Sequence, residues 1–153
     1  MARLETFPEP MRSHLAKLPC PSFESHPWAP GPALSQRRVA LISTAGLHRR
    51  GDRPFDGMTG EYRVIPKDCE ANDLVMTHVS TNFDRTGFQQ DWNVVFPLDR
   101  LKELVVEGVI GSVAEYHYSF MGAADPSQME PSARNLVGLL KEDRVDGALL
   151  VPV

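Results

Sequence analysis

Three histidines are the side chains best suited to chemistry in this 153-residue chain. His48, His78 and His117 each lie in or just after a short apolar run. An imidazole is the usual acid–base group near neutral pH and the commonest metal ligand. No HxH or HExxH spacing links the three, which argues against a metal site. Two interpretations therefore stay open: a role in a pocket, or a structural hydrogen bond to a main-chain carbonyl or a carboxylate.

Small and polar residues accompany the histidines. Ser43-Thr-Ala-Gly46 follows an apolar run and is compatible with anion binding at a strand–turn junction, but it has neither GxGxxG nor GxxxxGK[ST] spacing. A tight turn of small residues is the alternative. The polar segment from Asn82 to Asn93 either shapes a substrate site or forms a solvated loop. With the three histidines, we take Ser43 and Thr44 as candidates for a substrate pocket.

Cysteine usage and charge exclude several function classes. Cys20 and Cys69 form no CxxC, and neither has a basic neighbour in sequence that would activate it as a nucleophile. This pattern fits a reducing cytoplasm. The net charge of −4 gives no reason to expect nucleic acid as a partner. No apolar run approaches the roughly 18 residues of a membrane span.

The elements that must position these residues alternate between strands and helices. Continuous or alternating apolar runs predict strands at 39–44, 73–79, 115–120 and 147–152, with an edge strand at 61–66 that Pro66 ends.

Two helices are expected between the later strands. One covers 97–108, with Gly108 in the C′ position. The other begins at a capping box, Ser127-x-x-Glu130, and its apolar stripe comprises Met129, Ala133, Leu136, Val137 and Leu140.

Alternation of this kind predicts an α/β fold, Rossmann-like, with a mostly parallel sheet and crossover helices. Ligands bind such sheets outside the carboxyl ends of the strands. We therefore expect the three histidines to gather near the end of the strand at 147–152.

Residues 1–36 and 37–153 differ in composition. Seven of the 13 prolines precede residue 33. Since each proline fixes φ and removes a donor, residues 1–36 are expected to form an extended arm that crosses the domain surface, with free disorder as the alternative. Residues 37–153 are expected to be the N-terminal part of a longer α/β domain, because a strand at 147–152 completes only half of a βα unit.

Several segments, in this order and spacing, resemble the selenoprotein B family of the glycine, sarcosine, betaine and D-proline reductases, with the D-proline branch the most similar. The resemblance begins at Pro27-Trp28 and continues to the end of the chain. The segments that carry it are Val39-Ala-Leu-Ile-Ser-Thr-Ala-Gly-Leu-His48, Asp73-Leu-Val-Met-Thr-His78, Val95-Phe-Pro-Leu-Asp-Arg-Leu-Lys-Glu-Leu104, Glu107-Gly-Val-Ile-Gly111, His117-Tyr-Ser-Phe-Met-Gly122 and Leu140-Lys-Glu-Asp-Arg-Val-Asp-Gly-Ala-Leu-Leu150.

The resemblance implies a reaction: reductive cleavage of a C–N bond next to a carboxylate, with a dithiol/disulfide couple. It implies a selenocysteine or cysteine nucleophile directly after a strand like 147–153, a partner subunit whose pyruvoyl group holds the amine, and a thiol electron donor. We therefore expect the nucleophile at the position after Val153, encoded there by an in-frame UGA. Without it, the 153 residues are expected to have no reductase activity, and their uncovered apolar edge to favour self-association.

Three interpretations remain at this point. The chain is either part of such a reductase subunit or a noncatalytic α/β binding or assembly module that has lost the nucleophile. A degenerate gene product without a role is the third interpretation.

Overall fold

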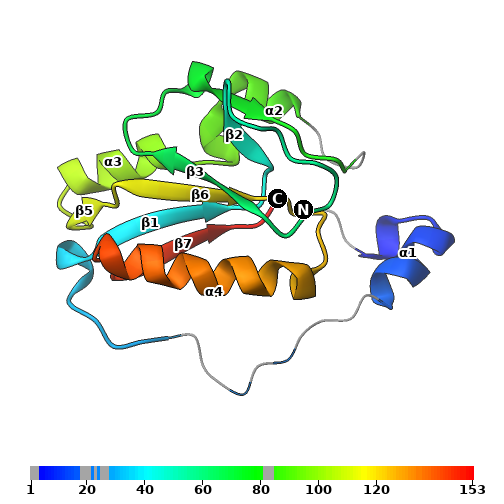
Figure 1. Cartoon of the computed structure of the whole chain (residues 1–153), viewed down its shortest axis with the longest axis horizontal. Helices are drawn as coiled ribbons and strands as arrows, with labels where there is room; N and C mark the ends of the chain where they lie inside the picture. Colours follow the sequence, from blue (N-terminus) through cyan, green and yellow to red (C-terminus); the bar gives the residue numbers. More distant parts are fainter. Residues whose placement is uncertain (1–3, 18–21, 23, 25–27, 81–84) are drawn as a thin grey trace.

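A five-stranded, mostly parallel sheet forms the centre of the molecule (Figure 1). The structure is a computed structural model that describes residues 4–17, 22, 24, 28–80 and 85–153. β1 (Arg38–Ser43) lies in the middle, and β7 (Gly147–Val151) runs parallel to it over five paired residues. The predicted strands at 39–44 and 147–152 are thereby confirmed.

The other side of β1 carries two strands in succession. β5 (Ser112–Val113) pairs with the beginning of β1, and β6 (Tyr116–Phe120) pairs with its end. Both run parallel to β1. The antiparallel edge strand β3 (Tyr62–Pro66) completes the sheet, and it ends at Pro66 as predicted.

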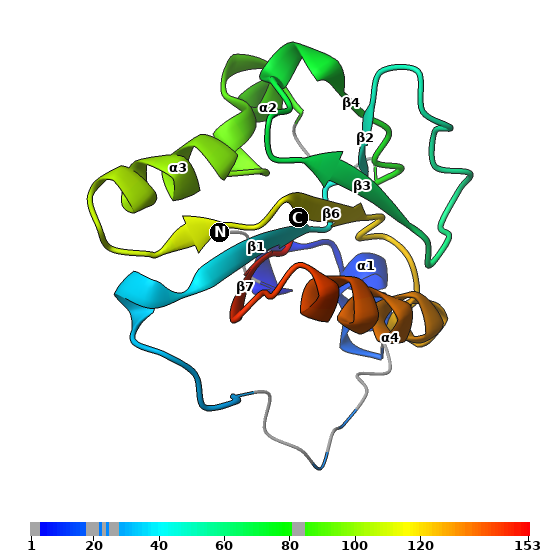
Figure 2. The ribbon, with the colours of Figure 1, turned by 60° about the vertical axis from the view of Figure 1, so that its left-hand side comes forward.

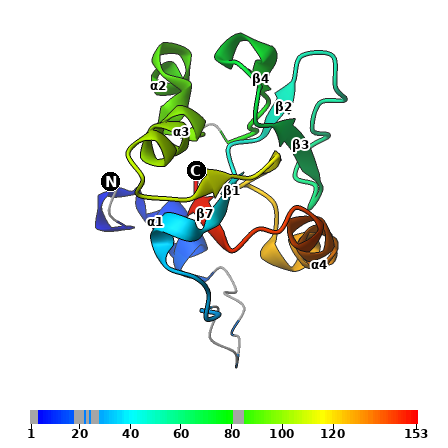
Figure 3. The same ribbon diagram turned by 90° about the vertical axis from the view of Figure 1, so that its left-hand side faces the viewer.

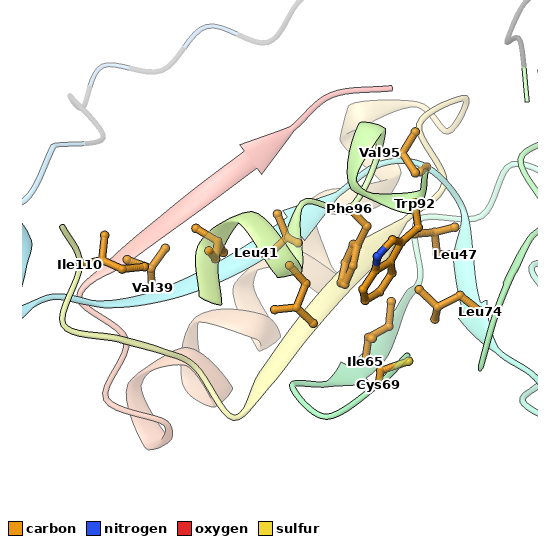
Figure 4. Close-up of a cluster of buried hydrophobic side chains, with 13 residues drawn as sticks. Val39, Leu41, Leu47, Ile65, Cys69, Leu74, Trp92, Val95, Phe96 and Ile110 are labelled. Atoms are coloured by element: carbon orange, nitrogen blue, oxygen red, sulfur yellow. The ribbon is translucent and has the colours of Figure 1, made fainter. Parts of the chain in front are cut away.

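Helices cover both faces of this sheet (Figure 3). On one face, Val39 and Leu41 belong to the same buried cluster as Leu98 and Leu101 of α3 (Leu98–Val106); Figure 4 shows this cluster. On the other face, α4 (Pro126–Glu142) packs its buried Leu136 with Tyr118 and Phe120 of β6. The connection β6–α4–β7 is a crossover between parallel strands, which confirms the predicted α/β class.

The capping of α4 differs from the prediction. Asp125, not Ser127, is the N-cap: its side chain accepts a hydrogen bond from the Ser127 main-chain N–H at 2.8 Å. Pro126 follows at the first helical position, where its missing N–H costs nothing. Ala133 and Val137 are exposed, so they are not part of the apolar stripe. The packed stripe consists of Met129, Leu136, Leu139 and Leu140.

A second, two-stranded sheet corrects the prediction for residues 73–79. Leu74–Met76 form β4, which pairs antiparallel with β2 (Leu47–Arg49) and does not enter the main sheet. Leu47 and Leu74 bury their side chains in the same cluster as α3. The apolar run at 73–79 is therefore explained by a small sheet packed against the core, visible in Figure 2 beside α2 (Thr86–Gln90).

The N-terminal segment is not extended throughout. Glu9–Ala16 form α1, an eight-residue helix with Pro10 in its first turn and no buried residue. Trp28, farther along the segment, is 86% exposed. Leu18 and Phe23, two other apolar residues of this segment, lie outside the described residues. No helix within the described ranges is long and apolar enough to cross a membrane.

Charged side chains gather at the amino ends of the strands, in a group that we call the amino-edge ion cluster: Arg38, Lys67, Glu115 and Asp143. The Arg38 guanidinium contacts the Asp143 carboxylate, and Lys67 Nζ lies 2.8 Å from Glu115 Oε2. Asp143 Oδ2 also accepts the Glu115 main-chain N–H at 2.6 Å. Burial opposes ionisation of Asp143, but these hydrogen bonds and the Arg38 charge lower its pKa from the ordinary value.

Candidate functional site

The turn that follows β1 is packed tightly and has no free donor for an anion. The four consecutive main-chain N–H groups from Thr44 to Leu47 donate to Val151 O, Ser43 Oγ, Phe120 O and Ser119 Oγ, respectively. Gly46 adopts a φ of 65°, and a Cβ there would stand 3.1 Å from the main chain of His78. The small residues are therefore explained by a tight turn, not by anion binding.

Ser43, a pocket candidate, is completely buried. Its hydroxyl donates a 2.7 Å hydrogen bond to the main-chain oxygen of Val95. It thus ties the end of β1 to the segment that leads into α3. The hydroxyl therefore stabilises the carboxyl end of β1 from the interior of the protein.

Thr44 stands at the carboxyl edge itself. Its main-chain N–H donates to Val151 O at 3.1 Å, and its Oγ1 accepts the Val153 N–H at 2.8 Å. This side chain therefore extends the pairing between β1 and β7 past the last residue of either strand.

His117 is the second residue of β6 and does not lie at the carboxyl end of that strand. Its Nδ1 accepts the main-chain N–H of Leu41 at 3.0 Å. This N–H faces the interruption between β5 and β6, where no strand supplies a partner. The imidazole therefore provides the hydrogen-bond acceptor that a neighbouring strand would supply at this position.

Burial also decides the charge of His117. The ring is fully buried and lies edge-on to the ring of Phe96. Burial lowers its pKa to about 4, so the side chain is neutral at physiological pH. A group with this pKa is poorly suited to exchange protons near neutrality.

His78 follows a strand of the small sheet, not of the main sheet as predicted. It follows β4, and its main chain lies beside Gly46 at the end of β1. Its Nδ1 accepts the Ser80 N–H at 3.2 Å, and burial, with the nearby Arg85 charge, lowers its pKa. The carboxyl edge therefore holds a buried imidazole whose neutral form is favoured.

His48 belongs to β2, in the small sheet. It is buried, and its Nδ1 bonds the Arg49 carbonyl oxygen at 2.9 Å. Its Nε2 has no hydrogen-bond partner among the described residues. The three histidines thus come from β2, from the end of β4 and from the interior of β6.

The polar segment near residue 90 is held by hydrogen bonds, including one that caps a short helix, and it lines a cavity. Residues 82–84 lie outside the described residues. The Asp91 side chain accepts the Asn93 main-chain N–H at 2.9 Å, and the Trp92 ring N–H donates to Asp99 Oδ2 at 2.7 Å. Asn93 Nδ2 also donates to Asp99 Oδ2, at 3.0 Å. Burial opposes ionisation of Asp99, but the hydrogen bonds from the Asn93 and Trp92 side chains lower its pKa.

This capping network explains why the segment is polar. It borders a cavity of about 380 Å³ whose other walls include Arg50, Phe88 and Gln89. Arg50 is itself hydrogen-bonded to Asn72 O. Arg50, Asp91, Trp92, Asn93 and Asp99, which border this cavity, are therefore engaged in hydrogen bonds within the chain.

Cys69 is buried in the core, and the other cysteine, Cys20, lies outside the described residues. Burial is the main reason that the pKa of its thiol is raised, to about 11. It is not suited to act as a nucleophile. In the described ranges, no three His, Cys, Asp or Glu side chains come together as a metal site requires.

Comparisons with known proteins agree with the resemblance found in the sequence. The family model described as glycine/sarcosine/betaine reductase selenoprotein B matches residues 12–153. The D-proline reductase subunit gamma of Acetoanaerobium sticklandii is 33% identical over 121 residues, which cover 76% of this chain and 49% of that protein. The betaine reductase complex component B subunit beta of Peptoclostridium acidaminophilum is 36% identical over 128 residues, covering 80% of this chain and 29% of that one.

A third relative extends the match. The glycine reductase complex component B subunit gamma of Carboxydothermus hydrogenoformans is 28% identical over 144 residues, covering 88% of this chain and 32% of the relative. The chain thus spans half the length of these curated relatives or less. No solved structure matches it. The family match covers most of the chain, and the chain therefore belongs to the selenoprotein B family of the glycine, sarcosine and betaine reductases.

Proposed function

We propose that this chain forms the part of a reductase subunit that builds the sheet from which the reacting group is presented. The reaction is reductive cleavage of a C–N bond next to a carboxylate, in an amino acid or betaine. One observation carries the proposal: β7 runs parallel to β1 over five paired residues, so its end points to the carboxyl edge, where parallel sheets bind ligands. The family match and the names of the relatives supply the reaction class.

The nucleophile of this proposal is a selenocysteine or cysteine at the position after Val153. In ionised form such a group attacks the α-carbon while the nitrogen departs with the bonding pair and takes up a proton. One thiol of a dithiol donor then attacks the selenium or sulfur of this adduct, and the carbon leaves with the bonding pair and is protonated. The second thiol closes the donor's disulfide and releases the nucleophile. A pyruvoyl group on a partner subunit is proposed to hold the substrate nitrogen.

The residues of this chain support that position from two sides. The Thr44 hydroxyl binds the main chain at Val153, and the His78 main chain packs against Gly46. We assign His78 the role of a hydrogen-bonding group for a substrate carboxylate, because it is the histidine at this edge. Ser43 and His117 act from the interior, where they fix the end of β1 and its pairing with β6.

The test begins with the coding sequence that follows the Val153 codon. We expect UGA or a cysteine codon there, a cysteine codon soon after it, and then a βα unit. The complete product is then prepared with its partner subunits, and substrate-dependent dithiol oxidation is measured with D-proline, glycine, sarcosine and betaine.

Two controls make this test decisive. Replacing the codon after Val153 with one for serine should abolish activity and leave the complex assembled. A complete product that assembles with the partner subunits and carries no selenocysteine or cysteine at this position would instead support a noncatalytic assembly module.

A further inference from the structure

Among the described residues, one side chain hydrogen-bonds the main chain just after β7. The last strand pair is Ser43 with Val151. One residue farther, Thr44 Oγ1 accepts the Val153 N–H at 2.8 Å and lies 3.3 Å from Val153 O, to which it donates. The Thr44 hydroxyl thus replaces the main-chain hydrogen bonds between the two strands at the point where β1 turns away from β7.

Gly122 closes the same contact from the other side. Its N–H donates to Thr44 O at 2.8 Å. A Cβ at position 122 would stand 2.6 Å from Val153 O and 2.9 Å from Thr44 O. Both neighbours are main-chain atoms, which cannot move away as a flexible side chain can, so only glycine fits without shifting the chain.

We propose that Thr44 and Gly122 are positioning residues that fix the direction in which the chain leaves β7. We call this arrangement the Thr44 clamp; it consists of Thr44, Gly122 and the main chain of Val153. The role of the positioned residue in catalysis rests on the proposed function. The clamp itself rests only on the contacts described above.

The clamp holds the chain through neutral groups. Its hydrogen bonds join a hydroxyl and main-chain atoms, so no charged side chain takes part in the clamp, and in a product that continues past Val153 the oxygen of Val153 is a neutral peptide oxygen. A reacting anion placed next along the chain would therefore meet no carboxylate of the clamp that raises its pKa.

The first test is NMR amide exchange on the full 153-residue chain. Thr44→Val keeps the shape of the side chain and removes the hydroxyl, so the Val153 N–H should exchange about tenfold faster. Thr44→Ser keeps the hydroxyl and should restore slow exchange. The matched control is Thr77→Val, since the Thr77 hydroxyl donates to Gly46 O at the same edge without touching Val153.

Glycine substitutions test the second half of the clamp. Gly122→Ala should shift the amide resonances of Thr44 and Val153, because the new methyl group displaces Val153 O. Gly138→Ala, at a helical glycine with open space around its Cβ position, should leave them unchanged. Equal Val153 exchange in the wild type and Thr44→Val would overturn the clamp.

The second test uses the complete, active reductase. Thr44→Val and Gly122→Ala should lower kcat at least tenfold with KM unchanged. Thr44→Ser should have nearly the wild-type kcat, and Gly138→Ala should change neither constant. Unchanged kcat in both variants would overturn the positioning role. If the wild type releases no amine while the exchange results hold, the proposed function fails and the clamp stands.

Discussion

The amino and carboxyl edges of the same sheet are held together by different interactions. At the amino edge, Arg38 and Asp143 form a largely buried ion pair, which joins β1 to the end of α4. At the carboxyl edge, the Thr44 hydroxyl and main-chain atoms make the equivalent connection between β1 and β7. Charge thus fastens the end of the sheet that faces away from the proposed reaction, and neutral groups fasten the end that faces it.

The interactions that mainly stabilise the fold and those that position the proposed reacting group thus lie at opposite edges of one sheet. An ion pair tolerates salt and pH changes poorly, while hydrogen bonds between neutral groups are much less sensitive to both. The fold can therefore lose part of its amino-edge stabilisation without altering the geometry of the carboxyl edge. The predictions below test this separation, beginning with the largest expected effect.

Lowering the pH should destabilise the amino half of the sheet through His117. Its folded pKa of about 4 lies below the ordinary 6.5, so the unfolded chain binds a proton that the folded chain rejects. The stabilisation is complete above pH 6.5 and is lost as the pH falls to about 4, by up to about 3 kcal/mol. Urea unfolding across this range measures the loss.

The variant His117→Asn isolates this effect. An asparagine oxygen can still accept the Leu41 N–H but does not titrate, so the free energy of unfolding should change less between these pH values. His14→Asn, at an exposed histidine, is the matched control and should keep the wild-type dependence of stability on pH. An unchanged profile in His117→Asn would assign the pH dependence to another group.

Asp143→Ala should cost about 2 kcal/mol, because it removes the carboxylate that pairs with the partly buried Arg38 guanidinium and accepts the Glu115 N–H. Arg38 keeps its hydrogen bond to the Asp143 main-chain oxygen in this variant. High salt should reduce this difference, since the pair is partly open to solvent. Urea unfolding of both proteins at low and high salt checks the value. A loss that does not depend on salt would mean that the main-chain hydrogen bonds dominate.

Thr44→Val should lower the free energy of unfolding by about 1 kcal/mol, the usual net value of one hydrogen bond. In a product that continues past Val153, the Thr44 hydroxyl contacts neutral peptide groups, so the loss measured there should be the same at low and high salt. Thermal and urea unfolding give the comparison with Asp143→Ala directly. A strong salt dependence in Thr44→Val would contradict the proposed contrast between the two edges.

Glu130→Ala should change stability by about 0.5 kcal/mol or less, because its ion pair with Arg134 lies on the exposed face of α4. This variant sets the baseline for charge removal away from either edge. A loss as large as that of Asp143→Ala would show that burial does not govern the amino-edge ion cluster.

Local patterns in the sequence were sufficient for the central elements. The apolar runs at 39–44 and 147–152 and the periodicity at 97–108 predict β1, β7 and α3 closely. Burial explains the run in β1 and the stripe on α3, whereas β7 leaves Leu149 and Leu150 exposed. The run at 73–79 was placed in the wrong sheet. An apolar run shows that a strand is buried, and it does not show which strand lies beside it.

Other features were missed for local reasons. Pro8 and Pro10 were interpreted as breakers of structure, although proline suits the first turn of a helix, as in α1. The same rule, applied to Pro126, identifies Asp125 as the N-cap of α4.

The role of His117 had no local signal at all. Its partner, the Leu41 N–H, lies 76 residues earlier in the chain. The Thr44 contact with Val153 spans 109 residues in the same way. Candidate residues were thus recognisable by type, but their tasks depend on contacts that only the folded sheet creates.

The buried Cys69 also affects how the chain behaves among reactive thiols. With a pKa of about 11, the fraction of its thiol that is ionised at neutral pH is on the order of one in ten thousand. Burial further denies reagents access to the sulfur. Beside the selenol and the dithiol of the proposed reaction, this cysteine stays out of exchange reactions as long as the core is closed. Its rate of alkylation therefore measures how often the core opens.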